Sequence, residues 1–113
     1  MALHCRLFAG VPELEACLVN DQAHLTAGTT GHHVRLVQEA LVKLGFNQID
    51  GRDYIDGIYG ASTAAAVLRY KTSRQIINRA YQSSPDNIVG KMTIKSLDTE
   101  MLARQNVPTP SAL

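Results

Sequence analysis

The chain has 113 residues, of which 45% are hydrophobic and 19% charged, and its formal net charge at pH 7 is +1. This composition is typical of one globular domain with its own core and excludes a disordered tail. The near-neutral charge argues against a nucleic-acid-binding surface, and no apolar run approaches the length of a membrane span. We therefore expect neither nucleic acid nor membrane among the partners.

Residues 1–30 are expected to form an N-terminal extension that contains one short helix. Residues 3–9 are compatible with a short strand or an extended arm. Pro12 is favoured in the first turn of a helix, and glutamates follow it, so we predict a helix over residues 12–19.

The two cysteines of the chain both lie in this extension. Cys17 falls on the apolar side of the short helix and is expected to pack as a small hydrophobic residue. Two cysteines do not make a disulfide framework, so free thiols are favoured over a bond between Cys5 and Cys17. The first residues lack the apolar stretch of a signal peptide. We expect synthesis in the cytoplasm, with any delivery elsewhere by a route that needs no such peptide.

Hydrophobic periodicity predicts three longer helices. The first spans residues 32–44, with one apolar stripe along its length, and Gly45 is expected to end it. The other two are predicted over residues 61–74 and 91–104. The predicted fold class is therefore all-α, a small three-helix bundle over residues 31–104. Residues 105–113 contain two prolines and are expected to form a flexible tail.

A short motif occurs twice, before the second and before the third of these helices. The copies are Asp56-Gly57-Ile58-Tyr59-Gly60 followed by Thr63, and Asp86-Asn87-Ile88-Val89-Gly90 followed by Thr93. Each copy predicts a tight turn that leads into a helix, and its final glycine is expected to allow unusual backbone angles. Asparagine tolerates positive φ, so Asn87 is predicted to keep the backbone shape of Gly57. We expect structural roles for Gly57, Gly60, Thr63, Asp86, Asn87, Gly90 and Thr93.

The first predicted helix carries Val34-x-x-Val37-Gln38-x-x-Leu41-x-x-Leu44-Gly45-Phe46, and the two turns lead into Ala66-Val67-x-x-Tyr70 and Leu97. In this order the motifs resemble the three-helix peptidoglycan-binding domain of bacterial and phage cell-wall hydrolases, over about residues 31–98. The resemblance implies a non-catalytic module that binds glycan strands or stem peptides. Lys71 stands where this family usually has glutamine, and the segment between Tyr70 and Asp86 is longer than usual.

Five side chains are candidates for contacting such a ligand: Gln38, Asp56, Tyr59, Arg69 and Lys71. Tyr59 lies in the turn motif and is expected to be partly exposed, offering an aromatic face to a sugar. Arg69 and Lys71 suit the carboxylates of stem peptides, and a solvated helix face is the alternative for both. Gln38 and Asp56 either reach the ligand or hold the turn backbone. Tyr54 and Tyr81 are further aromatic candidates.

Other kinds of site lack a pattern in this sequence. The histidines and cysteines do not form a zinc motif, and Asp50, Asp53 and Asp56 lack the spacing of a calcium loop. No signature of a nucleophile with its base is present, and Cys17 lies on an apolar stripe where nothing lowers its pKa. We expect no metal, no cofactor and no enzymatic activity.

Two functions are left open. The first is a peptidoglycan-binding module that anchors or targets a partner to the wall. The second is a protein-interaction adaptor that kept the fold and lost the glycan site, as part of a phage or secretion system. Its partner would be a cell-wall hydrolase or a secretion-system protein. A helix-turn-helix DNA-binding domain suits a small helical fold by analogy alone, and the near-neutral charge argues against it.

Overall fold

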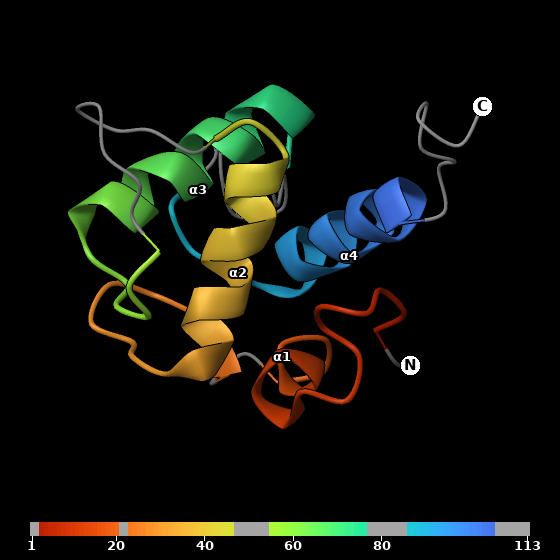
Figure 1. Cartoon of the computed structure of the whole chain (residues 1–113). Coiled ribbons are helices and arrows are strands. Elements are labelled where there is room, and N and C mark those ends of the chain that lie inside the picture. Colours follow the sequence, from red (N-terminus) through yellow and green to blue (C-terminus); the bar gives the residue numbers. More distant parts are fainter. Residues whose placement is uncertain (1–2, 21–22, 47–54, 77–85, 106–113) are drawn as a thin grey trace.

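The computed structural model describes residues 3–20, 23–46, 55–76 and 86–105, whose arrangement is shown in Figure 1. Their helices are α1 (Pro12–Ala16), α2 (His32–Lys43), α3 (Ala61–Arg74) and α4 (Lys91–Gln105). Within these ranges there is no regular strand, so the predicted all-α fold class is confirmed. Apart from Gln105, the predicted tail lies outside the described residues.

Helix α2 forms where the apolar stripe predicted it, and it ends in the predicted way. Val34, Val37 and Leu41 are fully buried. Gly45 has φ 97°, a backbone conformation that glycine adopts without steric cost. The N–H of Phe46 then donates to the carbonyl of Leu41 at 2.9 Å, which satisfies a carbonyl that the helix end would leave without a partner.

An aromatic and ionic cluster fixes the C-terminal half of α3 to its neighbours. The ring of Tyr70 meets that of Phe46 edge to face, with 5.5 Å between the centroids. The guanidinium of Arg74 lies 5.1 Å from the centroid of Tyr70 and donates to both carboxylate oxygens of Glu100 in α4. Tyr70 also donates to Glu100 and is within 2.6 Å of the Ser96 hydroxyl. The three longer helices therefore meet around one buried tyrosine.

The N-terminal residues form part of the same core. Cys5, Phe8 and Leu14 are fully buried among the hydrophobic residues of the longer helices. Residues 5–10 form turns, with the N–H of Ala9 donating to the carbonyl of Cys5 at 2.9 Å, so both the strand and the extended arm are wrong for this stretch. The short helix α1 is present but ends at Ala16, where turns continue to residue 19.

A buried carboxylate ties this N-terminal segment to the last helix. Asp98 in α4 is 5% exposed, and its Oδ1 accepts hydrogen bonds from the backbone N–H groups of His4 and Cys5 at 2.9 and 2.8 Å. Cys5 and Cys17 are both buried free thiols. The Cys17 thiol donates to the carbonyl oxygen of Ala23 at 3.0 Å, which is consistent with its predicted packing role.

Residues 25–31, here called the crossing segment, run antiparallel to both copies of the repeated motif. Leu25 pairs with Val89 of the second copy through two backbone hydrogen bonds of 3.0 and 2.9 Å. Thr30 pairs with Ile58 of the first copy. The crossing segment therefore joins two turns that are thirty residues apart in the sequence.

Candidate functional site

Gln38 of α2 holds the first turn (residues 55–60) from inside. Its side chain is fully buried. Nε2 donates to Oδ1 of Asp56 at 3.0 Å, to the carbonyl of Ile58 at 3.1 Å and to the hydroxyl of Thr63 at 2.8 Å. Oε1 accepts the N–H groups of Asp56 and Gly57 at 3.0 and 2.9 Å. The amide is thus saturated by the protein, which favours its turn-holding role over ligand contact.

Asp56 stabilises the same turn and remains exposed. Its Oδ1 accepts the N–H of Ile58 at 3.0 Å, as an aspartate does when it bends the chain. That hydrogen bond, followed by the one from Gln38, lowers the pKa of the Asp56 carboxyl. Gly57 has φ 75°, and a Cβ atom there would lie 3.2 Å from the carbonyl oxygen of Gly31, so this position requires glycine.

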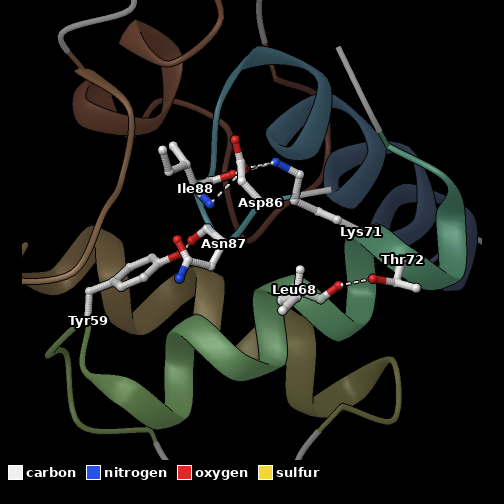
Figure 2. A network of polar contacts seen from close by, with 7 residues as sticks. All are labelled: Tyr59, Leu68, Lys71, Thr72, Asp86, Asn87 and Ile88. Atoms are coloured by element: carbon white, nitrogen blue, oxygen red, sulfur yellow. Dashed lines mark hydrogen bonds and ion pairs between the residues drawn. The ribbon is translucent and has the colours of Figure 1, made fainter. Parts of the chain in front are cut away.

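Lys71 of α3 does for the second turn (residues 86–90) what Gln38 does for the first. Its ammonium donates to Oδ1 of Asp86 at 2.5 Å and to the carbonyl of Ile88 at 2.9 Å, as Figure 2 shows. The N–H of Ile88 donates to the same Asp86 oxygen at 3.0 Å. Lys71 is 6% exposed, so the predicted solvated position on the helix face is wrong. Lys71 lies on the inner face of α3 because it is four residues after the buried Val67, as Gln38 is four residues after the buried Val34.

Tyr59 connects the two turns and is 1% exposed, so its expected partial exposure is also wrong. Its hydroxyl donates to the backbone carbonyl of Asn87 (Figure 2). Burial, and secondarily the charge of Asp86, raises the pKa of the phenol. The crossing segment covers the residue, because the N–H of Tyr59 donates to Thr29 at 2.8 Å and Gly28 donates to Tyr59 at 2.9 Å.

Two expectations about the backbone of the turns are wrong. Gly60 has φ −104° and ψ −164°, an extended conformation open to any residue, and no atom would contact a Cβ there. Among the described residues Gln75 is the one non-glycine residue with positive φ, so Asn87 does not reproduce Gly57. At Gly90 a Cβ would lie 3.0 Å from the imidazole of His24, so a larger residue there would displace that side chain by a few tenths of an ångström.

The comparisons with known proteins agree with this architecture. The model of the peptidoglycan binding domain family matches residues 30–97. The chain belongs to this family. Its helices α2 and α3, both turns and the first half of α4 lie within the match. The family is a binding domain rather than a catalytic one. Within this peptidoglycan-binding domain, Lys71 takes the place of the usual glutamine, and its ion pair with Asp86 preserves the hold on the second turn.

One relative lies in a secretion system. The chain is 33% identical over 94 residues to the type VI secretion system spike protein VgrG3 of Vibrio cholerae serotype O1 (strain ATCC 39315 / El Tor Inaba N16961). The alignment covers 80% of this chain and 9% of that protein, so the chain corresponds to a small part of its relative. No solved structure gives a significant match.

The five ligand candidates do not converge on one surface of the peptidoglycan-binding domain. Gln38, Tyr59 and Lys71 are buried, whereas Asp56 and Arg69 are exposed. Arg69 lies over the ring of Phe46, 5.8 Å from its centroid. It is eight residues into α3, about 12 Å along the helix axis from the end that adjoins the first turn.

The structure adds two exposed apolar side chains that sequence reasoning missed. Ile58 in the first turn is 52% exposed, and Met92, two residues after the second turn, is 51% exposed. A short turn has no periodicity from which exposure can be predicted, so only the repeated motif itself drew attention to Ile58. Tyr54, Tyr81, Asp50 and Asp53 lie outside the described residues.

Over residues 3–20, 23–46, 55–76 and 86–105, no three His, Cys, Asp or Glu side chains are grouped as a metal site would need. None of the helices in those ranges has the length and apolar character to cross a membrane.

Proposed function

We propose that the chain is a non-catalytic peptidoglycan-binding module that holds a partner at the bacterial cell wall. The observation that carries this proposal is membership of the peptidoglycan binding domain family over residues 30–97. The hydrogen-bond pattern supports it, since each of the two turns is held by one buried polar side chain from the preceding helix. A fold kept intact at both turns presents its exposed residues in fixed positions, which reduces the entropy lost on binding.

The proposed contact surface is the exposed side of the first turn. Asp56 offers an ionised carboxylate, whose lowered pKa keeps it charged at neutral pH, to sugar hydroxyls or amide N–H groups. Ile58 offers apolar area beside it. Arg69 is a separate candidate for a stem-peptide carboxylate, about two helical turns beyond this surface. Gln38, Tyr59 and Lys71 support the surface from inside.

Cosedimentation with purified peptidoglycan sacculi tests this proposal. The informative variants are Asp56→Asn, which keeps the oxygen that accepts the Ile58 N–H, and Arg69→Gln on the exposed side of α3. Lys95→Gln on α4 is the control, because it removes one exposed positive charge elsewhere. We expect saturable binding of the wild type, binding about tenfold weaker for at least one of the two variants, and no change for the control.

Two results would count against the proposal. The wild type would remain in the supernatant at low salt, or Lys95→Gln would weaken binding as much as the two informative variants do. Release of soluble sugar from the sacculi should stay at background, because the proposed module does not cleave the wall.

A second function is favoured by the similarity to VgrG3. We infer as the alternative that the chain is an adaptor within a secretion apparatus, in which the same fold binds a protein. Copurification from the native host discriminates between the two. A stoichiometric secretion-system partner, with no binding to sacculi, supports the adaptor, whereas sacculus binding without such a partner supports the wall module.

A further inference from the structure

A groove of about 570 Å³ is lined by residues that belong to neither turn. The N-terminal segment, the end of α2 and the C-terminal half of α4 form it, and it is lined by Cys5, Arg6, Leu7, Lys43, Met101 and Arg104. In Figure 1 the N-terminal segment passes beside α4. The volume falls within the range of sites that hold a small molecule or a short peptide segment.

The lining combines three cations with apolar side chains and contains no carboxylate residue. Cys5 and Met101 are buried and Leu7 is half-buried, so they supply apolar area. In the part of the chain that the structure describes, neither Lys43 nor Arg104 forms an ion pair.

Two of the three basic residues are at helix ends, where cations are favoured, but this does not explain why all three line one groove. Lys43 and Arg104 stand in the last turns of α2 and α4, where a cation offsets the partial negative charge of the helix end. Arg6 comes from a non-helical segment and is a third basic residue of the lining. A concave site lined by charge of one sign attracts ligands of the other sign.

The groove shares no lining residue with the proposed wall-binding surface, and its α4 wall lies away from the second turn. Arg104 is thirteen residues beyond the start of α4, which adjoins the second turn, a distance of about 20 Å along the axis. Five of the six lining residues fall outside residues 30–97, the part that matches the family. The groove is therefore a feature of this chain's flanking segments rather than of the shared domain.

We propose that this groove binds an acidic segment of a protein partner, in which carboxylates flank one or more apolar side chains. The carboxylates pair with Lys43 and Arg104, and the apolar side chain covers Leu7 and Met101. Charge complementarity identifies the occupant, and the near-neutral net charge of the chain disfavours nucleic acid as the alternative polyanion. The proposal does not depend on whether the first turn binds the wall.

Fluorescence anisotropy of the full chain with a fluorescein-labelled peptide of alternating glutamate and leucine tests it. We expect saturable binding that weakens as salt rises and falls about tenfold with Lys43→Glu or Arg104→Glu. Both positions are exposed, so both variants should fold. Lys95→Glu, an equal change of charge on the exposed face of α4, should leave the affinity unchanged. A lysine–leucine peptide should not bind.

Four outcomes would overturn the proposal: no saturable binding, an equal loss with Lys95→Glu, equal binding of a glutamate–serine peptide, or binding of duplex DNA in place of the peptide.

Sacculus binding by Lys43→Glu is measured in parallel. If it is kept while the peptide affinity is lost, the groove and the wall surface are independent. If the chain binds the peptide but does not bind sacculi, the proposed wall-binding function is wrong and the groove proposal stands.

Discussion

The carboxamide of Gln38 in α2 and the ammonium of Lys71 in α3 make equivalent contacts. Each donates to an aspartate oxygen and to the carbonyl two residues further on, in the turn that follows its helix. The first contact joins the neutral amide of Gln38 to the Asp56 carboxylate, whereas the second is an ion pair between Lys71 and Asp86. The Lys71 side chain is 8% exposed and the Asp86 side chain 33%. The two turns should therefore respond differently to substitution.

Replacing Gln38 with glutamate should destabilise the first turn strongly. Gln38→Glu puts an oxygen where Nε2 now donates three hydrogen bonds, opposite the acceptor oxygens of Asp56 and Ile58. We expect the free energy of unfolding at pH 7 to fall by about 3 kcal/mol, measured by urea denaturation. Glu39→Gln, at the neighbouring half-exposed position, should change it by less than about 0.5 kcal/mol. Equal effects of both substitutions would contradict the role of Gln38 in holding the first turn.

Two substitutions at Lys71 should separate hydrogen bonding from simple space filling. Lys71→Met keeps the length of the side chain but leaves the Asp86 carboxylate without its cation, so we expect a loss of about 2 kcal/mol. Lys71→Gln restores the residue usual in the family and should retain more stability than methionine. Chemical denaturation ranks the three proteins, and a methionine variant as stable as wild type would show that the ion pair contributes nothing.

The buried thiols should make the protein sensitive to alkaline pH. Burial raises the pKa of Cys5 and of Cys17 from 9.0 to about 11, with a further contribution from Asp98 at Cys5. The folded state therefore holds these protons more tightly than the unfolded state. This contribution is complete below pH 9 and is lost as the pH rises to about 11.

The double variant Cys5→Ala with Cys17→Ala tests this linkage. The unfolding free energy of the wild type should fall between pH 9.5 and 10.5 by roughly 1 kcal/mol more per thiol than that of the variant. The tyrosines titrate equally in both proteins and cancel in the difference. If the unfolding free energies of the wild type and the variant change with pH in the same way, the raised pKa of the two thiols is contradicted.

Removing the carboxylate of Asp98 should release the N-terminal segment. Asp98→Ala leaves the N–H groups of His4 and Cys5 without their acceptor, so hydrogen exchange over residues 3–9 should accelerate at least tenfold. We expect a loss of about 2 kcal/mol in stability. Thr99→Ala, at the adjacent exposed position, is the control and should leave exchange in that segment unchanged.

The sequence was sufficient for the helices and for the family, because both depend on local pattern. The apolar stripe ending at Gly45 predicts α2 to within one residue, and the predicted bounds of α3 agree with the structure. The orientation of Tyr59 and Lys71 was not predictable in the same way. Their burial depends on the crossing segment and on the second turn, which lie about sixty residues apart in the chain and carry no local signal.

The N-terminal segment shows the same limit. Cys5 and Phe8 lie in turns without helical or strand periodicity, so their full burial follows only from tertiary packing in the common core. The groove beside them was equally invisible, because Arg6, Lys43 and Arg104 are separated by most of the chain. Charges that converge through tertiary structure look like ordinary surface residues in the sequence.

The link between His4 and Asp98 spans 94 positions and has a consequence for how the protein is made. A ribosome must release nearly the whole domain before that contact forms, and Leu25 likewise waits for Val89. The first helices emerge with their apolar faces exposed until α4 arrives, so folding of this domain should be completed only once α4 has left the ribosome. A nascent chain stalled before residue 98 should remain sensitive to protease in its first thirty residues.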